Sequence, residues 1–426
     1  MTQASQTARN QNEAPGTQPT GILKDIRVLD LSRVLAGPLC GQLLADLGAD
    51  VIKVERPQRG DDSRAWGPPY LADSAGEPTQ ESAFYCACNR GKRSITIDLA
   101  KPEGRDLVKK LAGSCDVLLE NYKVGTLDRY GLGYDELARH NPKLIYCSIT
   151  GFGQTGPYRA RPGYDTIIQA MGGLMSITGM QEGAPGAGPV RVGIALTDFM
   201  TGLYATIAVQ SALLRRAQTG KGQYIDLSLL DVQVSALSAV AMNYLVSGEV
   251  PVRRGNRLPT VYPSDAFRCE DGYLMVIIGN DQQFRRFCEA AGLDGLDEDA
   301  RFRTNEDRVR NADVLALKIS AALAKRRVAD WLLLFEKAHV ASGPINDIAQ
   351  VFKDPQVIAR DMLVELDHPL AGKMPSIANP IKFSESAIRY ERAPPTLGQH
   401  TREVIEEVLG LTEAEFGALK ASGALG

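Results

Sequence analysis

One carboxylate, Asp198, stands between two apolar runs in the stretch RVGIALTDFMTGLYA, residues 191–205. The residues before it suit a buried strand, whereas Phe199, Leu203 and Ile207 recur at helical spacing after it. Aspartate is a preferred helix N-cap, so capping is the first interpretation of this residue. A carboxylate at a helix start is also kept ionised by the helix dipole. It can therefore act as a nucleophile where water is excluded.

Basic residues recur in the loops that adjoin the expected strands. They are Lys53, Arg56, Arg90, Lys92, Arg93, Lys123 and Arg129. Loops at the carboxyl ends of parallel strands are where such sheets bind ligands, and several cations there can hold phosphate groups. Any one of these residues could simply be a solvated side chain of a surface loop. Their recurrence after several strands is what favours an anion-binding site.

Other catalytic motifs are missing from the sequence. The first expected strand is followed by SRVLAGPLCG rather than G-x-G-x-x-G, and neither a P-loop nor G-x-S-x-G occurs. The four histidines lie far apart. Of the seven cysteines only Cys86 and Cys88 are neighbours, without a second pair. We therefore expect no metal site and no tightly bound cofactor.

The length and composition suit a chain with two domains. The chain has 426 residues, 44% of them hydrophobic, and its formal net charge of −3 does not favour binding to nucleic acid. No window of about 18 apolar residues occurs, so we expect no membrane span. Scattered cysteines and no visible signal peptide favour a cytoplasmic location, and a cleaved organelle transit peptide at the N-terminus is the alternative.

Strand-like and helix-like segments alternate from Ile22 onwards. The expected strands are 26–31, 51–55, 94–99, 116–120, 144–150 and 223–227, and helices are expected at 39–47 and 103–112. This βαβ rhythm predicts an α/β fold, a Rossmann-like and mostly parallel sheet covered by helices on both faces.

The character of the sequence changes near residue 250. A helix is expected at 229–245, followed by a hairpin at 265–278 and helices near 281–291, 313–325 and 328–339. A strand near 362–366 and a helix at 402–409 complete the tail. We expect a disordered N-terminus (1–20), a large α/β domain (21–228), a linker helix (229–249), a small α+β domain (250–345) and a final segment (346–426).

Taken together, these pieces resemble the class III CoA-transferases, the family of formyl-CoA, carnitine-CoA and bile-acid-CoA transferases. The resemblance runs from about residue 21 to about residue 409. The matching text is LDLSRVLAGP, GADVIKVERPQRGDDSR, NRGKRSITIDL, VLLENYKVGTLDRYGL, SITGFGQTGPY, RPGYDTIIQA, GIALTDFMTG, TGKGQYIDLSLLD and LGQHT.

The resemblance implies a catalytic role for Asp198, because the family's nucleophile is an aspartate in G-x-x-x-x-D-x-x-x-G, which Gly193, Asp198 and Gly202 match. It implies that CoA is a substrate bound by the large domain. The implied contacts are Val34, Leu35, Ala36, Arg56, Ile97, Leu99, Ala100, Asn121, Tyr122, Lys123, Arg129, Tyr164 and Asp165. Arg56 and Arg129 would face phosphate groups of CoA, and the side chains of Ile97 and Leu99 would pack against its adenine ring.

Two positions depart from members of the family. Leu35 stands where formyl-CoA transferases have glutamine, and their glycine-rich flap is not found here, which argues against a formyl or oxalyl specialist. Acyl-CoA racemases share the fold but pair the aspartate with a histidine in G-H-D, where this chain has Gly163-Tyr164-Asp165. Racemisation, the alternative activity, would lack that second base.

Within the family, the chain is most similar to succinyl-CoA:glutarate-type dicarboxylate transferases. The segments that carry this similarity are GDDSRAWGPPY, YCSITGFGQTGP, GNDQQF, SGPINDIAQVFKDPQV and PPTLGQHT. Mesaconate, malate, itaconate, oxalate or carnitine are alternative acceptors. A dicarboxylate needs a cation for its far carboxylate, and Arg33, Arg253 and Arg254 are candidates. The family also implies an interlocked homodimer, with a final segment (346–426) that returns to the large domain.

Overall fold

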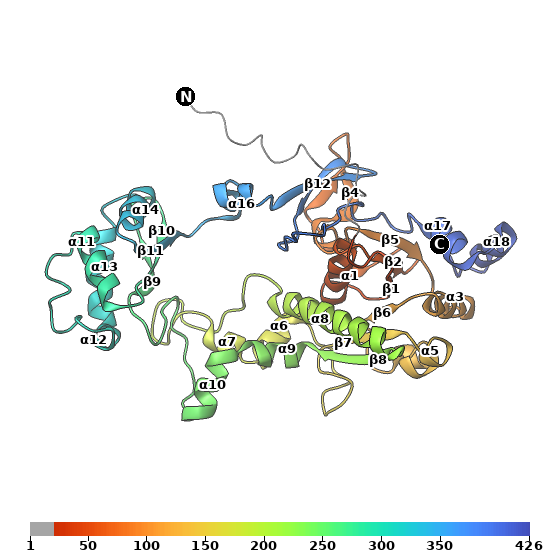
Figure 1. Ribbon diagram of the computed structural model, residues 1–426, viewed down its shortest axis with the longest axis horizontal. Helices are drawn as coiled ribbons and strands as arrows, with labels where there is room; N and C mark the ends of the chain where they lie inside the picture. Colours follow the sequence, from red (N-terminus) through yellow and green to blue (C-terminus); the bar gives the residue numbers. More distant parts are fainter. Residues whose placement is uncertain (1–20) are drawn as a thin grey trace. The chain divides into compact units, whose positions relative to one another are not determined.

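The computed structural model describes residues 21–426, and the disorder expected for residues 1–20 lies outside this range. Contacts divide the chain into two compact units, and each is described by itself (Figure 1). The first unit contains the chain up to Gly172, Gly193–Ala236 and Asp361–Gly426. The second contains Gly173–Val192 and Leu237–Arg360.

The second unit is larger than the small domain expected at 250–345. It takes in Gly173–Val192, which the sequence placed in the large domain. Its contacts explain this difference, because Nη2 of Arg253 forms an ion pair with Glu182 at 2.6 Å. The segment is thereby fastened to residues that lie about 70 positions further along the chain.

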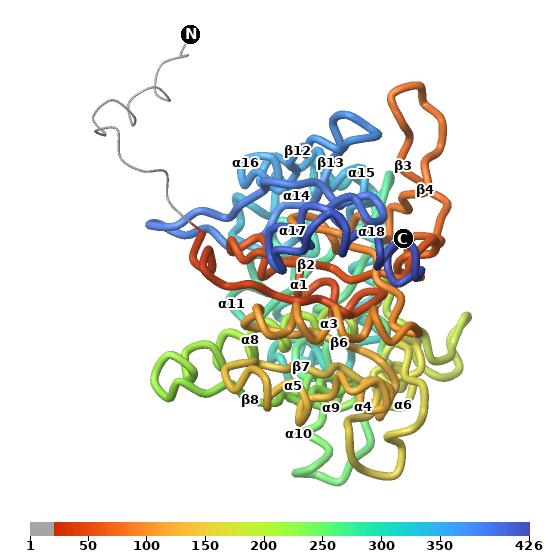
Figure 2. Tube along the Cα trace, turned by 90° about the vertical axis from the view of Figure 1, so that its right-hand side faces the viewer, coloured from red at the N-terminus to blue at the C-terminus, as the bar shows by residue number. Residues whose placement is uncertain are grey.

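Six parallel strands form the sheet of the first unit, in the order β5-β2-β1-β6-β7-β8. Figure 2 shows β2, β6, β7 and β8 following one another across it. The strands are β1 (Arg27–Asp30), β2 (Asp50–Glu55), β5 (Lys92–Thr96), β6 (Val117–Glu120), β7 (Ile145–Thr150) and β8 (Gln223–Ser228). The expectation of an α/β fold with a parallel sheet is confirmed.

Helices cover both faces of this sheet, because alternate strand residues point to opposite sides. Val28 and Val117 pack in one cluster with α1 and α8, whereas Leu29 and Leu118 pack in another with α3 and α17. The helices are α1 (Ala36–Asp46), α3 (Pro102–Gly113), α5 (Tyr134–His140), α8 (Leu196–Thr219), α17 (Thr401–Leu409) and α18 (Glu413–Ala421).

Shorter elements complete the first unit. They are η1 (Asp62–Ala65), β3 (Tyr70–Ala72), β4 (Pro78–Ser82), α2 (Ala83–Cys86), α4 (Thr126–Arg129), α6 (Asp165–Met171), α9 (Leu229–Ala236), β12 (Leu363–His368) and β13 (Gly372–Ile377). The expected tail strand at 362–366 is thus one arm of a hairpin, β12–β13.

The second unit combines an antiparallel sheet of three strands with helices. The expected hairpin is β9–β10, and β11 pairs with β10 on the other side. The elements are α7 (Leu174–Ile177), α10 (Ser238–Ser247), β9 (Ser264–Arg268), β10 (Tyr273–Ile277), α11 (Asp281–Ala291), α12 (Asn305–Arg310), α13 (Ala312–Leu323), α14 (Val328–Lys337), β11 (Ala341–Pro344), α15 (Ile348–Val351) and α16 (Pro355–Ala359).

Two local expectations are wrong. The helix expected at 229–245 is interrupted between α9 and α10, because Ser238 has a φ of 46°, outside the helical range. Residues 191–195, just before Asp198, form no strand. In the part of the chain that is described, no single helix is long and apolar enough to cross a membrane. Among the described helices, α9 and α10 together, as a bent pair, pass that test by length and composition.

Candidate active site

The strand order of the first unit creates a natural ligand site between β1 and β6. The chain leaves β1 toward one edge of the sheet and leaves β6 toward the other, so the loops at their carboxyl ends diverge. The two loops are tied together by Asn121. Its Oδ1 accepts from the N–H of Arg33 at 2.9 Å, and its Nδ2 donates to the carbonyl oxygen of Arg33 at 2.7 Å.

Asp198 is the third residue of α8, not its N-cap. The N-cap is Ala195, whose methyl group cannot accept a hydrogen bond, and Asp165 takes over that role from outside the helix. Oδ1 of Asp165 accepts from the N–H of Thr197 at 2.8 Å and from the N–H of Asp198 at 3.2 Å. The capping interpretation of Asp198 is therefore wrong, and its carboxylate is left available for chemistry.

The Asp198 carboxylate lies in an environment that disfavours its charge. The residue is half-buried, and among the described residues no group donates a hydrogen bond to its side chain. Burial, and then the negative charge of Asp165, raise the pKa of Asp198 to about 7. The sequence suggested a carboxylate held ionised by the helix dipole, but desolvation and the neighbouring acid outweigh that effect.

A cavity of about 200 Å³, here called the nucleophile cavity, opens beside Asp198. It lies at the carboxyl ends of β1, β6 and β7, where the loops after these strands meet the start of α8. The candidate residues that line it with Asp198 are Arg33, Val34, Leu35, Ala36, Asn121, Tyr122, Lys123 and Tyr164.

A second cavity of about 320 Å³, here called the distal cavity, shares Arg33 and Tyr122 with the first. It lies at the ends of β2 and β5. The candidate residues that line it are Arg56, Ile97, Leu99 and Ala100, together with Tyr122. Nearly all the expected coenzyme contacts thus lie in loops at the carboxyl ends of neighbouring strands, around these two cavities.

The remaining candidates lie elsewhere. Arg129 is exposed and outside both cavities, with its Nη2 3.3 Å from the hydroxyl of Thr126. Asp165 is buried under the start of α8 rather than lining a cavity. Arg253 and Arg254 belong to the second unit. Their part in substrate binding stays a prediction.

A sequence profile described as CoA-transferase family III matches residues 23–401. The chain belongs to this family.

Named relatives and a solved structure agree with the assignment. A succinate–glutarate CoA-transferase of Agrobacterium fabrum is 47% identical over 396 residues, which cover 93% of this chain and 97% of the relative. A human succinyl-CoA:glutarate CoA-transferase is 42% identical, with 98% of this chain and 92% of the relative covered. The crystal structure of a CAIB/BAIF family protein from Brucella suis matches with a TM-score of 0.83 and 46% identity, covering 92% of this chain and all of that one.

Several basic residues singled out in the sequence are not free to bind the transferase's anionic substrate. Nζ of Lys53 is 2.9 Å from Asp61, and Nζ of Lys92 is 2.9 Å from Asp30, with all four side chains fully buried. Arg90 and Arg93 are likewise held by Asp46 and Asp50. The phosphate interpretation of these four cations is therefore wrong, and Arg56, Lys123 and Arg129 remain.

Asp61 organises the entrance to α1 and is a residue that the sequence analysis missed. Val34 has a φ of 73°, which is strained for a β-branched residue. The Asp61 carboxylate accepts from its N–H at 3.1 Å and from Ser63, besides pairing with Lys53. Burial raises the pKa of Asp61, but the charge of Lys53 and the hydrogen bonds from Lys53 and Ser63 outweigh it and lower the pKa to about 2. The available signal was the acidic pair in GDDSR, whose partners are distant in sequence.

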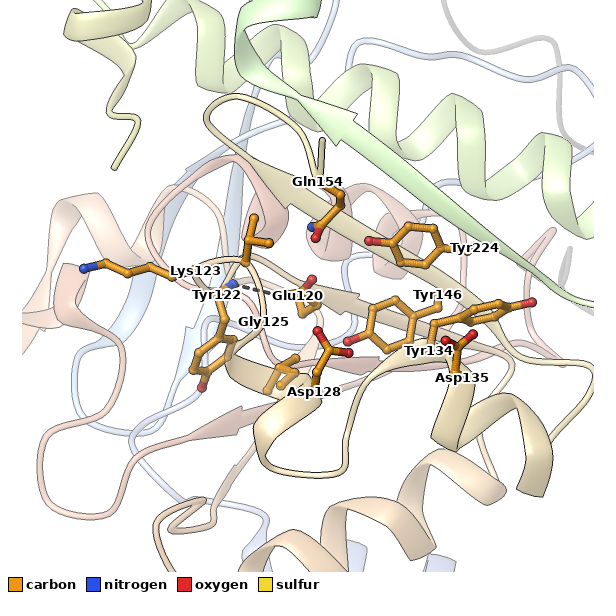
Figure 3. A pocket seen from close by; sticks show the side chains of 12 residues that line it. Glu120, Tyr122, Lys123, Gly125, Asp128, Tyr134, Asp135, Tyr146, Gln154 and Tyr224 are labelled. Carbon is orange, nitrogen blue, oxygen red and sulfur yellow. Dashed lines mark hydrogen bonds between the residues drawn. The ribbon is translucent and has the colours of Figure 1, made fainter. Parts of the chain in front are cut away.

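A third cavity, of about 260 Å³, shares the turn after β6 with the nucleophile cavity (Figure 3). Glu120 lies in it beside three tyrosines, Tyr134, Tyr146 and Tyr224. Burial raises the pKa of Glu120 to about 7, and its Oε2 accepts from the N–H of Tyr122 at 2.8 Å. Glu120 therefore positions the turn that carries the candidate residues at 121–123.

The raised pKa of Asp198 predicts how the transferase responds to pH. Because only the ionised carboxylate attacks, kcat/KM is expected to fall as pH drops through about 7 and to level off above about 8. Asp165→Asn removes the negative charge beside Asp198, so in this variant the fall of kcat/KM should occur at lower pH. Initial rates between pH 5 and 9 measure both curves. A wild-type midpoint near 4 would contradict the desolvated environment, and an unshifted midpoint in Asp165→Asn would contradict the role of its charge.

Proposed function

We propose that this chain transfers CoA from succinyl-CoA to glutarate, with Asp198 as the covalent nucleophile. The observation that carries the proposal is the Asp198 carboxylate, desolvated and without a hydrogen-bond donor among the described residues, in a cavity formed by the expected coenzyme contacts. The choice of substrates is supported by relatives that are 42–47% identical and bear these substrates in their names.

The first half of the reaction releases the donor acid. An oxygen of Asp198 attacks the thioester carbonyl, the C–S bond breaks, and CoA leaves as its thiolate, so a mixed anhydride forms. The thiolate then attacks the aspartyl carbonyl and expels succinate, which leaves an aspartyl-CoA thioester. A carboxylate poorly solvated by water is a better nucleophile, so the environment that raises the pKa of Asp198 also assists this attack.

The second half runs in the opposite sense. A glutarate carboxylate attacks the aspartyl thioester and displaces the thiolate, which then attacks the glutaryl carbonyl and frees Asp198. The N–H groups of Ala36 and Gly37, the first two residues of α1, have no partner within the helix, and Ala36 lines the nucleophile cavity. In the proposed mechanism these N–H groups stabilise the oxyanions. Each anhydride keeps the activation of the thioester, so ATP is not required.

A panel of acceptors tests the proposed function. Purified protein is incubated with succinyl-CoA and, separately, with glutarate, mesaconate, malate, itaconate, oxalate or carnitine, and acyl-CoA products are identified by mass spectrometry. Glutaryl-CoA should form fastest. If the configuration at the α-carbon of an α-methyl acyl-CoA is lost without any acceptor present, the result would instead favour the racemase alternative. Tyr164 argues against that alternative, because it stands in the nucleophile cavity where a racemase has its histidine.

We also propose that the chain works as a homodimer, with the interlocked arrangement that the family implies. Its support is an apolar stripe on α8 that stays exposed in the single chain: Phe199 is 44%, Leu203 39% and Ile207 59% exposed. A helix normally buries such a stripe against a partner.

Ile207→Glu is therefore expected to weaken dimers, which size-exclusion chromatography with light scattering measures. The matched control is Thr219→Glu, an exposed position at the end of the same helix. A wild-type protein that is monomeric at micromolar concentration would contradict the proposal.

A cytoplasmic location is proposed on the basis of the seven cysteines, all of which are buried and free of disulfide bonds. Fractionation of cells that express the tagged chain tests it. Recovery of the enzyme in an oxidising compartment would contradict it.

A further inference from the structure

Two arginines enter the nucleophile cavity from the loop between β7 and α6. Arg159 and Arg161 line this cavity together with Asp198. Within residues 21–426, neither guanidinium takes part in an ion pair, whereas Arg33 in the same cavity is paired with Asp62 at 2.8 Å. The loop thus brings two uncompensated positive charges to the cavity in which the acyl group must react.

The loop packs on its own side chains and holds Arg161 in place. Its two ends touch, because a Cβ added to Gly151 would lie 2.5 Å from Cα of Gly163. Inside it, the rings of Phe152 and Tyr158 pack edge to face at 5.7 Å, and the guanidinium of Arg161 lies over the Tyr158 ring at 3.9 Å. A surface loop that packs on its own side chains presents charged groups in a defined direction.

The chemistry of the substrate calls for a cation a few methylene lengths away from the reacting carbonyl. Succinyl and glutaryl groups each carry a second carboxylate, a few methylenes away from the reacting carbonyl. Arg159 and Arg161 share the nucleophile cavity with Asp198, so they are placed to meet this second carboxylate while the carbonyl reacts at Asp198.

Coenzyme phosphates are a weaker explanation for these arginines. The diphosphate of CoA is separated from its sulfur by the whole pantetheine arm. Arg56, Ile97 and Leu99 line the distal cavity, which suits the nucleotide end. A cation that shares its cavity with Asp198 is placed to meet the acyl group at the sulfur end.

We propose that Arg159 and Arg161 bind the remote carboxylate of the dicarboxylate acyl group and thereby select dicarboxylates over monocarboxylates. The inference rests on the proposed function. Arginine suits this task because its planar guanidinium donates two parallel hydrogen bonds to a carboxylate.

The test compares glutarate with glutarate monoamide, an acceptor of the same shape whose far end is neutral. The variants are Arg159→Gln, Arg161→Gln and the double substitution. The double variant is expected to lower kcat/KM for glutarate by about 100-fold, because hydrogen bonds to a charged group are lost. For the monoamide, kcat/KM should change by less than about threefold.

Two controls separate this inference from other effects. Arg215→Gln removes an exposed arginine of α8 that does not line the cavity, and it should leave both acceptors unchanged. Calorimetric titration with free CoA should give the same Kd for wild type and double variant.

Three outcomes would overturn the inference: an equal loss for glutarate and monoamide, no loss for either, or a weakened CoA affinity that accounts for the change. A wild-type enzyme that transfers CoA to no dicarboxylate would instead overturn the proposed function, and the inference with it.

Discussion

Asp198→Asn is expected to reduce CoA transfer by about 10⁴-fold or more, since loss of a covalent nucleophile removes the reaction path itself. Affinity for free CoA should change little, because the coenzyme contacts are supplied by other loops. Wild-type enzyme incubated with succinyl-CoA should yield a CoA adduct on Asp198 in peptide mass spectra, and hydroxylamine should convert that residue to a hydroxamate.

The matched control is Asp106→Asn, an exposed aspartate on α3, which should keep full activity. Rates must be measured on freshly prepared Asp198→Asn, before deamidation restores aspartate, and Asp198→Ala serves as a second variant. Sustained turnover by the alanine variant would refute the assignment of the nucleophile.

The same substitution should stabilise the fold at alkaline pH. The pKa of Asp198 is about 7 in the folded protein and about 4 in the unfolded chain, so the folded state holds the proton more tightly. The contribution of this group to stability is therefore complete below about pH 4 and is lost as pH rises through about 7. Asp198→Asn removes the ionised, poorly solvated group, so its melting temperature should exceed that of wild type at pH 8 by more than it does at pH 5. This result would also exclude misfolding as the reason for lost activity.

Asp61→Ala is expected to have the largest effect on stability, about 3–5 kcal/mol of unfolding free energy. It leaves the charge of Lys53 buried without its partner and removes the acceptor for the N–H of Val34. Urea unfolding followed by circular dichroism gives the free energy. Activity should also fall, because the strained backbone of Val34 lines the nucleophile cavity.

The neighbouring Asp62 provides a matched control. It pairs with Arg33 at 2.8 Å, but its side chain is 53% exposed. Ion pairs in contact with solvent contribute little, so Asp62→Ala should cost less than about 1 kcal/mol. Equal losses for Asp61→Ala and Asp62→Ala would contradict the importance assigned to the buried pair.

The neighbourhood of Asp198 explains how one carboxylate can serve a reaction that moves no net proton. Asp165 takes the helix N–H groups and adds a like charge, while burial removes water. Both effects destabilise the ionised ground state, and attack on a carbonyl disperses that charge. The fold thus maintains an unfavourable charge at the site of chemistry, and buried ion pairs such as Lys53–Asp61 hold the surrounding loops in place.

The sequence by itself predicted where the parallel strands lie along the chain and the helices at 281–291 and 402–409, and its resemblance to the family named the candidate nucleophile. These follow from local patterns: apolar runs, helical periodicity, turn residues and ordered motifs that a chain carries along its length. The resemblance to the family supplied most of the candidate coenzyme contacts, and nearly all of these line one of the two cavities, at the edge of the sheet where loops after parallel strands converge.

Only the tertiary structure decided which charged groups are free. Lys53 and Lys92 resembled ligand-binding cations until buried carboxylates were found beside them, and Asp198 resembled a cap until Asp165 was found in that role. Arg159 and Arg161 stood out only once their loop faced Asp198. The physical reason is that ion pairing and desolvation depend on neighbours in space, such as Asp165 and Asp198, which are 33 residues apart in the chain.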